Sequence, residues 1–330
     1  MNGADHTKDE RDRLLLIHFG QMGDAVLALP AARAFAAWGG AERVTVLASR
    51  SGAEIFRLAG FRSVWPVDRV RWKARPATAV WEIPRLVWQL RRQRFALSVD
   101  LHSLKETNLL AWLAGVPTRV AMLRPTRSYP RLINRPPPPD DPEAALLERY
   151  CRVLEPLGIT VEDRCPRLSP SAAETAAAAA RLPGKDWLGV CPGAGHASRR
   201  WPAERFAAVV CAGLQAAPAL RAVVFAGPEE SEATLAPFRL APRTQIVRGL
   251  SLAALAASLA RCRVVLSNAS GPAHVAAAVG AHVISIGEIP PFDPVGWTPD
   301  AVRVVRAHGR VVDVPQSAVT AALAGMLTAG

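Results

Sequence analysis

Residues 189–206 and 264–280 share one local pattern that constrains the fold more than any other feature of the chain. Each segment has a run of β-branched and other apolar residues, then a turn of small residues, then an alanine-rich stretch. The pattern predicts a buried strand, a tight turn and a helix, the unit of a parallel α/β sheet. The amino terminus of such a helix presents unpaired N–H groups and a partial positive charge. Two of them in one half of the chain indicate a site for a diphosphate.

The turns of these two segments contain small and cationic side chains. Arg199 and Arg200 follow the first turn, ahead of Trp201-Pro202 at the start of the predicted helix. A guanidinium group can bind two phosphate oxygens at once, so both arginines suit a doubly charged leaving group. The candidate diphosphate ligands are Gly193, Ala194, Arg199, Arg200, Ser270, Gly271, Pro272 and His274.

The same alternation of strands and helices recurs along the chain and predicts two similar domains. Apolar runs lie at 14–17, 44–47, 97–101, 188–190, 222–225, 264–266 and 283–286. Helices are expected at 26–37, 83–90, 143–157 and 317–327, and an exposed loop at 135–142. A chain of 330 residues accommodates two globular domains. We predict the α/β class, with Rossmann-like domains over 1–165 and 186–330 and a linker over 166–185.

Positive charge is concentrated in two stretches of the first half. The formal net charge is +12, and residues 57–94 contain ten Lys or Arg against Asp68 and Glu82. Residues 119–135 contain five arginines and no acid. Such stretches form either a solvated basic surface or a binding face for an anionic partner. They lack helix-turn-helix, RNP and zinc-module patterns, so we expect no nucleic-acid partner.

The amino-terminal residues and the apolar runs indicate a cytoplasmic protein. Residues 1–13 are polar and charged, so we predict no signal peptide, and no uncharged apolar run is long enough to span a membrane. Cysteines at 151, 165, 191, 211 and 262 have no C-x-x-C spacing and are expected to be buried and reduced. We expect no metal site and no cofactor, because no D-x-D pair or His/Asp cluster has the spacing of metal ligands.

Four segments resemble signature stretches of glycosyltransferase family 9, the ADP-heptose:lipopolysaccharide heptosyltransferases. P-G-A-G-H-A-S-R-R-W-P at 192–202 resembles the family's P-G-A-S, spacer, K-R-W-P loop, and N-A-S-G-P-A-H at 268–274 resembles N-D-[ST]-G-P-x-H. G-Q-M-G-D-A-V-L-A-L-P at 20–30 resembles S-S-x-G-D-x-x-x-x-x-P, and D-L-H-S-L at 100–104 resembles D-x-Q-G-L. Four blocks in this order and spacing argue against a chance similarity.

The resemblance implies an enzyme of glycosyltransferase-B architecture, in which two Rossmann-like domains face each other across a cleft. It implies an inverting, metal-independent transfer of a heptose or related sugar from a nucleotide sugar, with ADP-heptose as the leading candidate. The donor would bind to the second domain, and an anionic glycolipid acceptor of the lipopolysaccharide inner-core type would bind to the first. The basic first domain would then work peripherally at the inner face of the cytoplasmic membrane.

Asp24 matches the residue treated as the catalytic base in the resembled family. A sugar hydroxyl is a weak nucleophile, so a carboxylate must accept its proton as the new glycosidic bond forms. Asp24 follows the first predicted strand, at the edge where ligands of open α/β sheets bind. A second role stays open for Asp24, that of an N-cap which serves only the helix around Leu27.

Other roles follow from the basic stretches and from the resemblance. The expected acceptor-binding residues are His18, Arg69, Arg71, Lys73, His102, Lys105 and Arg124. His18 stands where relatives carry Lys or Arg, and it either orients a phosphate or fills the loop. For the donor, we expect Leu250 near the adenine and Glu229 near the ribose hydroxyls, the alternative for Glu229 being a solvated loop acid.

The chain also departs from the family pattern. Ala269 replaces the Asp that in relatives helps to hold the donor sugar or its phosphate loop. Gly195 stands where Ser or Thr is common, Gly20 and Gln21 replace serines, and Glu106 stands where a basic residue is common. Two alternatives therefore stay open: a transferase for another nucleotide sugar and acceptor, and a non-catalytic relative that binds a nucleotide sugar or glycolipid. A Rossmann dehydrogenase is disfavoured because residues 14–24 lack G-x-G-x-x-G.

Overall fold

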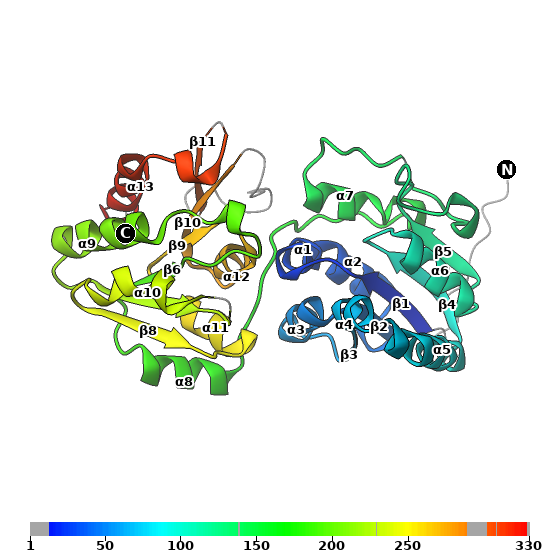
Figure 1. The fold of residues 1–330 in the computed structure, drawn as a ribbon. Helices are drawn as coiled ribbons and strands as arrows, with labels where there is room; N and C mark the ends of the chain where they lie inside the picture. Colours follow the sequence, from blue (N-terminus) through cyan, green and yellow to red (C-terminus); the bar gives the residue numbers. More distant parts are fainter. Residues whose placement is uncertain (1–12, 138, 229, 289–301, 308, 329–330) are drawn as a thin grey trace. The chain divides into compact units, whose positions relative to one another are not determined.

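The computed structural model describes residues 13–137, 139–228, 230–288, 302–307 and 309–328. The chain divides into two compact units, one ending at Arg164 and the other beginning at Cys165. Each unit contains one parallel sheet with helices packed against it (Figure 1). The strand order is β3-β2-β1-β4-β5 in the first unit and β11-β10-β9-β6-β7-β8 in the second. The predicted α/β class with two Rossmann-like sheets is confirmed.

The first unit is built around β1, which lies between β2 and β4. Leu16 in the middle of β1 is paired with Val46 on one side and Val99 on the other. The elements of this unit are β1 (Arg13–His18), α1 (Met22–Leu27), α2 (Leu29–Gly39), η1 (Ala41–Arg43), β2 (Val44–Ser49), α3 (Arg50–Leu58), β3 (Ser63–Val67), α4 (Arg69–Ala74), α5 (Pro76–Gln93), β4 (Phe95–Asp100), α6 (Lys105–Leu113), β5 (Thr118–Ala121), η2 (Pro130–Leu132), α7 (Leu146–Arg152) and η3 (Glu155–Leu157).

The second unit is built around β9, which lies between β10 and β6. Leu266 in β9 is paired with Ile284 and with Val190. The elements of this unit are α8 (Ala172–Arg181), β6 (Trp187–Cys191), η4 (Ala197–Arg199), α9 (Ala203–Ala216), β7 (Arg221–Ala226), α10 (Glu232–Arg239), β8 (Thr244–Arg248), α11 (Leu252–Leu259), β9 (Val264–Asn268), α12 (Gly271–Ala278), β10 (His282–Glu288), β11 (Val302–Ala307), η5 (Val311–Asp313) and α13 (Gln316–Thr328).

The sequence pattern identifies every interior strand and misses every edge strand. The seven predicted apolar runs correspond to β1, β2, β4, β6, β7, β9 and β10. The four other strands, β3, β5, β8 and β11, lie at the two edges of each sheet. An interior parallel strand is buried on both faces and reads as a continuous apolar run, whereas an edge strand is partly exposed. Pro66 within β3 is typical of an edge, since proline cannot donate to a neighbouring strand.

Three predicted segments differ from the structure. The helix expected over 26–37 is two helices, α1 and α2, with Pro30 in the first turn of α2, where its missing N–H is tolerated. The helix expected over 143–157 is shorter, with α7 followed by the single turn η3. The loop 135–142 is not simply exposed, because the Asp140 side chain is only 4% exposed.

Each unit has its own hydrophobic core. In the first, Leu15 and Ile17 of β1 pack with side chains of α5 and α6. In the second, β6, β7 and β9 pack with α9 and with α13, the helix predicted at 317–327. All five cysteines are free thiols, and Cys151, Cys191 and Cys262 are buried, as predicted. Cys165 and Cys211 are only partly buried, so the predicted burial is wrong for these two. Burial raises the pKa of the Cys191 thiol to about 12, so it stays protonated at neutral pH.

Candidate functional site

The carboxyl ends of β1 and β4 form the first candidate site. From β1 the chain adds β2 and β3 on one side, and it then adds β4 and β5 on the other side. The order of the parallel strands therefore reverses between β1 and β4. Ligands of open α/β sheets bind outside the carboxyl ends of the strands at such a reversal. The segments there are the turn between β1 and α1, which contains Gly20, and the turn between β4 and α6, which contains His102.

Asp24 lies in the first turn of α1 and is half-buried. The helix N-cap is Gln21, and Asp24 is three positions later. The Asp24 Oδ2 atom accepts a hydrogen bond of 2.9 Å from the Gln21 backbone N–H. The N-cap role considered for Asp24 is therefore wrong, since its carboxylate instead reaches back to the amide of the cap residue. This bond fixes the Asp24 side chain over the turn that follows β1.

Gly20 leaves room for both Asp24 and His18. A Cβ atom at Gly20 would lie 2.7 Å from the Asp24 Cβ and 2.7 Å from the His18 Cε1. Contacts that short do not occur between real side chains, so one of the two neighbours would have to move. His18 and Gly20 are thus coupled departures from the family pattern, because the imidazole ring occupies the space that a side chain at position 20 needs.

His18 is the centre of a buried ring cluster. Its ring centroid lies 5.5 Å from that of His102, 5.5 Å from that of Tyr150 and 5.7 Å from that of Phe56. Its Nε2 atom lies 3.3 Å from the Tyr150 hydroxyl, within hydrogen-bond distance. Burial and the neighbouring His102 hold the pKa of His18 well below its ordinary value. A neutral imidazole with no exposed surface supports the loop-filling role of His18 over the phosphate-binding one.

Asp100 organises the turn after β4 and was not predicted as a site residue. Its carboxylate accepts hydrogen bonds from the backbone N–H of His102 at 3.1 Å and of Ser103 at 2.7 Å. The Asn108 amide donates a third bond at 3.0 Å. Burial raises the pKa of Asp100 to about 6 despite these donors. The signal for it was the acid at the end of an apolar run, in the segment that resembles D-x-Q-G-L.

Ser103 stands where the D-x-Q-G-L segment of the family has glycine. Its φ is +54°, in the left-handed region that favours glycine. The Ser103 hydroxyl donates to the Asp100 carbonyl oxygen at 2.7 Å and accepts from the Met122 N–H at 2.8 Å. These two bonds offset the backbone cost, because a side chain with local hydrogen bonds tolerates this conformation better than an apolar one. His102 in the same turn is half-buried. Burial is the main cause that lowers the pKa of His102 to about 3, and the positive charge of Arg124 is the second cause.

The predicted acceptor-binding cations of the first unit lie in different environments. The Arg69 guanidinium pairs with Glu106 and lies 5.5 Å from the Phe19 ring centroid, beside the β1 turn. Glu106, an acid where relatives carry a base, is thus matched by a cation from α4. Arg71 pairs with Glu82 at 3.1 Å. Lys105 lies 5.5 Å from the Tyr129 ring centroid, and Lys73 is exposed on α4.

Arg124 is largely buried in an ion cluster. Its Nε atom lies 3.2 Å from the Asp140 Oδ2, and the same carboxylate accepts two hydrogen bonds from Arg149. A further nitrogen of Arg124 donates to the His102 carbonyl oxygen at 2.9 Å. Two guanidinium groups thus share one carboxylate, which leaves one excess positive charge beside the His102 turn. Any acceptor contact of Arg124 is made from a side chain that already fixes this turn.

The carboxyl ends of β6 and β9 form the second candidate site. The order in which the chain adds parallel strands to the second sheet reverses between these two neighbours. The strands of both segments singled out from the sequence, 189–206 and 264–280, therefore end at the point where an open α/β sheet binds its ligands. α12 starts at Gly271 after β9, with Ser270 as its N-cap, and α9 starts at Ala203 after β6 and η4.

Asn268 joins the two turns and was not predicted as a site residue. Its Oδ1 atom accepts a hydrogen bond of 3.0 Å from the Trp201 backbone N–H, and its amide donates 2.6 Å to the Pro192 carbonyl oxygen. The Asn268 side chain is completely buried. The Ser270 hydroxyl adds a bond of 3.3 Å to the Gly193 carbonyl oxygen. The family motif quoted around position 268 was the available signal, but the partners come from a segment about 70 residues away along the chain.

In the turn after β6, Arg199 is exposed and Arg200 is hydrogen-bonded to the turn itself. Arg199 is exposed at the end of η4. The Arg200 Nε atom donates a hydrogen bond of 3.0 Å to the Ala194 carbonyl oxygen, so this guanidinium holds the turn. Trp201 is buried and its indole N–H donates 3.0 Å to the Val314 carbonyl oxygen. Of the two predicted arginines, Arg199 is the more exposed.

In the turn after β9 and the helix that follows it, the His274 side chain is buried. Pro272 occupies the first turn of α12, where its missing N–H is tolerated. His274 is buried, and burial lowers the pKa of His274 to about 4, so it is neutral at neutral pH. The Ala269 N–H donates 2.7 Å to the Ile286 carbonyl oxygen, which ties this position to β10. Any role of His274 in donor binding is therefore indirect, through the position of α12.

Glu229 and Leu250 are the two remaining predicted donor residues. Glu229 is outside the described residues. Its neighbour Glu230, which was not predicted, places its carboxylate against Gly193, where any Cβ atom would collide with it. A side chain at position 193 would therefore displace the Glu230 carboxylate from this turn. Leu250 is half-buried after Gly249, whose φ is +69°, and it immediately precedes the N-cap of α11.

The described residues were compared with the requirements of a metal site and of a membrane-spanning helix. Among the described residues, no group of three or more His, Cys, Asp or Glu side chains could hold a metal ion. In the part of the chain that the structure describes, no helix combines the length and apolar character needed to cross a membrane.

A Gly20→Ser substitution is expected to be harmful, whereas Gly195→Ser is expected to be nearly neutral. Both positions carry serine or a related residue in the resembled family, but only Gly20 is enclosed. A Cβ at Gly195 has no atom within 4 Å. Overpacking at Gly20 should destabilise the first unit by about 1–3 kcal/mol and displace Asp24. Urea unfolding and transfer assays of the two variants check this, and equal behaviour would show that the β1 turn adapts freely.

Comparisons with known proteins agree with this geometry. The model of glycosyltransferase family 9 (heptosyltransferase) matches residues 83–306. No curated protein matches the chain. A glycosyltransferase family 9 structure from Veillonella parvula has 19% identity, with a TM-score of 0.79 over 97% of this chain and 99% of its own. Escherichia coli ADP-heptose lps heptosyltransferase II has 21% identity, with a TM-score of 0.76 over 96% and 99%.

A third similar protein, Escherichia coli heptosyltransferase WaaC, has been solved with two ligands. Its complex with ADP has 20% identity and a TM-score of 0.77 over 95% of this chain and 99% of its own. Its complex with ADP-2-deoxy-2-fluoro heptose has 20% identity and a TM-score of 0.74 over the same shares. At such identities these likenesses establish the fold.

Proposed function

Because the chain belongs to glycosyltransferase family 9, a family of heptosyltransferases, we propose that it transfers a heptose from ADP-heptose to a lipopolysaccharide acceptor of the inner-core type. The observation that carries the proposal is the diphosphate cradle at β6 and β9. The turns that lead into α9 and α12 lie at the point where the strand order of the sheet reverses. The Asn268 side chain joins these two turns by hydrogen bonds, and Arg199 in the first of them is exposed. The ADP complexes of WaaC support the adenosine diphosphate part of the donor.

The second unit supplies the donor site in this proposal. The diphosphate binds to backbone N–H groups at the start of α12 and to the Arg199 guanidinium. Glu229, or else Glu230, whose carboxylate lies against Gly193, accepts hydrogen bonds from the ribose hydroxyls. Leu250 packs near the adenine. These groups stabilise the negative charge that develops on the leaving diphosphate, so cationic side chains and helix dipoles provide the role that a metal ion has elsewhere.

The first unit supplies the base and the acceptor site. As the acceptor hydroxyl oxygen bonds to the anomeric carbon, its proton moves to the Asp24 carboxylate and the bond from that carbon to the diphosphate oxygen breaks. A single displacement inverts the anomeric configuration. Arg69, Lys105 and the excess charge of the Arg124 cluster attract the phosphorylated acceptor, with Arg71, Lys73 and His102 nearby. A glycolipid acceptor of this kind places the enzyme at the inner face of a membrane.

The proposal is tested by transfer from ADP-heptose to heptose-deficient lipopolysaccharide. Mass spectrometry should show that the acceptor gains one heptose residue, with ADP released in equal amount. The anomeric configuration of the product, measured by NMR, tests inversion. Activity that persists in a chelator tests independence from metal ions. Absence of transfer from ADP-heptose under all conditions would refute the proposed donor.

A second candidate donor is favoured by one observation. Ala269 stands where relatives have an acid that helps to hold the donor sugar or its phosphate loop. A pocket without this carboxylate suits a sugar with a different pattern of hydroxyls, because an unmatched polar group lowers affinity. Mass spectrometry of the nucleotide sugar that copurifies with the protein, followed by transfer assays with it, distinguishes this donor from ADP-heptose.

Arg199→Ala is expected to weaken ADP binding about 10- to 100-fold. The substitution removes charge-assisted hydrogen bonds to the diphosphate, which contribute about 1.5–3 kcal/mol. Because Arg199 is exposed, the fold should be unaffected. Calorimetric titration with ADP measures the effect, and Arg239→Ala, at an exposed arginine of α10 in the same unit, is the matched control. An unchanged affinity for Arg199→Ala would remove this residue from the donor site.

A further inference from the structure

Helix α5 has two apolar sides, and only one of them packs against its own unit. Leu86, Val87 and Leu90 face the core of the first unit. On the opposite side, Trp81 is 80% exposed and Trp88 is 56% exposed. Seven residues separate the two tryptophans, so they lie on one side of the helix, two turns apart. The outer side of α5 therefore exposes aromatic surface that the fold does not use.

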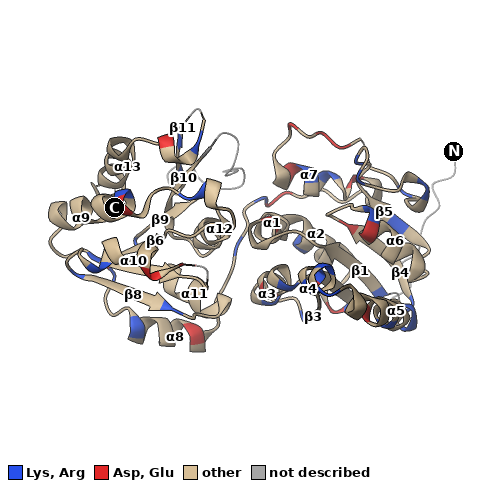
Figure 2. Cartoon of the chain, viewed as in Figure 1, with Lys and Arg blue, Asp and Glu red and all other residues tan. Residues whose placement is uncertain are grey.

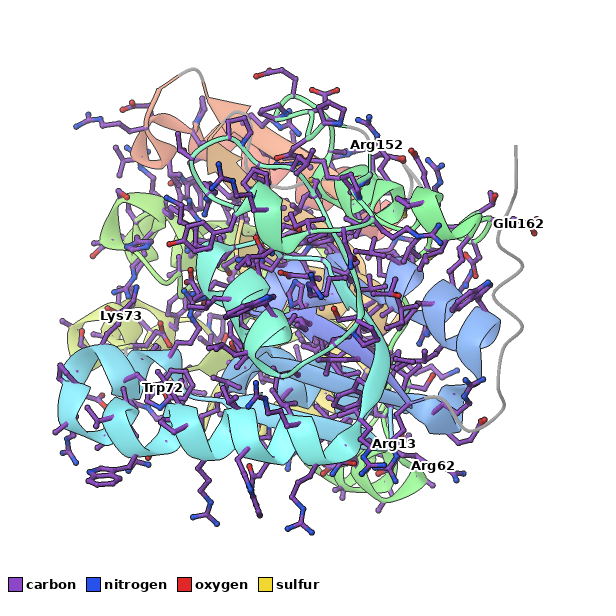
Figure 3. The ribbon with its side chains drawn as sticks, turned by 90° about the vertical axis from the view of Figure 1, so that its right-hand side faces the viewer. Arg13, Arg62, Trp72, Lys73, Arg152 and Glu162 are labelled. Atoms are coloured by element: carbon purple, nitrogen blue, oxygen red, sulfur yellow. The ribbon has the colours of Figure 1, made fainter. Side chains whose placement is uncertain are left out.

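Further apolar side chains adjoin the tryptophans. Val80, in the turn of Trp81, is 63% exposed, and Pro84 lies between the tryptophans on the same side. Val70 on the preceding helix α4 is 77% exposed. Isolated exposed apolar residues are common, but a group along one helix side marks an interaction surface. Figure 3, in which Trp72 and Lys73 of α4 are labelled, views this end of the unit, with side chains of the cyan helix α5 projecting outward.

The charges on this side of α5 are positive. Arg85 and Arg92 lie on the same side of the helix as the tryptophans, and the Arg92 guanidinium lies 4.7 Å from the Trp88 ring centroid. Glu82 is the single acid in 76–93, and it faces α4, where it accepts a bond of 2.6 Å from the Trp72 indole. Figure 2 shows Lys and Arg along α4 and α5. We name this surface, defined by Trp81, Trp88, Arg85 and Arg92, the α5 outer face.

We propose that the α5 outer face docks on an anionic lipid surface. Tryptophan prefers the boundary between water and lipid, where its ring lies among the headgroups. A helix with basic and aromatic side chains on its exposed side lies in the plane of that boundary. Each arginine near an anionic leaflet strengthens binding about fivefold.

The charge of the face selects this occupant over a second copy of the chain. In a symmetric dimer through the α5 outer face, the same arginines would meet across the interface and repel one another. An anionic bilayer offers opposite charge over its whole surface together with an apolar layer for the tryptophans. This inference rests on the proposed function. Docking through the α5 outer face would hold the first unit at the membrane surface that contains the glycolipid acceptor.

Vesicle flotation of the whole protein tests the tryptophans. Wild-type protein should float with vesicles of equal parts phosphatidylglycerol and phosphatidylcholine, and much less with phosphatidylcholine alone. The double variant Trp81→Ala, Trp88→Ala should bind at least about tenfold more weakly, because it loses the apolar part of the contact. Leu240→Ala, at an 87% exposed apolar residue of the second unit, should bind as the wild type does.

A second pair of variants tests the arginines. Arg85→Gln with Arg92→Gln should weaken binding about 25-fold at low salt and reduce its salt dependence. The control pair, Arg62→Gln with Arg303→Gln, removes the same charge from exposed arginines outside α5. Equal binding of the α5 variants and the wild type, or equal binding to charged and uncharged vesicles, would overturn the proposal. Lipid-free self-association that Trp81→Ala, Trp88→Ala abolishes would also overturn it, in favour of a dimer face.

Activity on a water-soluble acceptor separates this inference from the proposed function. The α5 variants should transfer sugar to a delipidated core oligosaccharide at the wild-type rate, because none of the substituted residues belongs to the proposed donor or acceptor site. Loss of that activity in folded variants would contradict a docking role. If the wild type binds anionic vesicles but transfers no sugar to any acceptor, the proposed function fails while the docking face stands.

Discussion

Asp24→Asn is expected to lower the rate of sugar transfer about 10²–10⁴-fold while the protein stays folded. An amide can still accept the hydrogen bond from the Gln21 N–H, which Asp24 Oδ2 accepts at 2.9 Å. It cannot accept the proton of the acceptor hydroxyl. Single-turnover transfer and thermal melting of the variant measure the two properties, and donor affinity should be nearly unchanged because Asp24 belongs to the other unit.

Asp68→Asn is the matched control for this experiment. Asp68 is the N-cap of α4 in the same unit, and its carboxylate accepts a hydrogen bond of 2.9 Å from the Arg71 N–H. Asparagine caps a helix as well as aspartate does, so this variant should retain near wild-type transfer. Near wild-type transfer by Asp24→Asn would assign Asp24 a structural role. The search for the base would then turn to His102, because His18 has no exposed surface.

Asn268→Ala is expected to destabilise the second unit by about 2–4 kcal/mol and to weaken donor binding. The change leaves the Trp201 N–H and the Pro192 carbonyl oxygen without their side-chain partner in a buried site. Each unsatisfied buried group costs about 1–3 kcal/mol. Hydrogen exchange of the β6 and β9 amides measures the stability of this unit separately. Calorimetry with ADP measures the effect on the two turns that Asn268 joins.

Asn134→Ala provides a control with the same bonding pattern at an exposed position. The Asn134 Oδ1 atom accepts a hydrogen bond of 2.7 Å from the Arg119 N–H, and its amide donates 2.6 Å to the Pro117 carbonyl oxygen. Water can replace both bonds there, so the loss of stability should stay below about 1 kcal/mol. Equal losses in the two variants would mean that burial does not set the importance of Asn268.

Local sequence was sufficient to predict an element wherever the segment has the same environment on all sides. The seven interior strands are buried on both faces, so each reads as an apolar run without reference to its neighbours. The turns around Gly193 and Gly271 were also predictable locally, because each is a strand, small residues and a helix in succession. The family resemblance and the glycosyltransferase assignment rest on these same segments.

Only the tertiary structure decided how side chains from distant segments meet. Tyr150 approaches His18 across 132 positions of sequence, and Asn268 reaches Trp201 across 67. His18 and His274 are both buried in the packed chain, and burial leaves both imidazoles neutral where the sequence suggested ligands. Arg200 donates from its Nε atom to the turn itself, whereas Arg199 faces solvent. Burial and pairing are properties of the packed chain, so residue type and spacing alone could predict which groups gather at the sheet edges, but not which of them a ligand can reach.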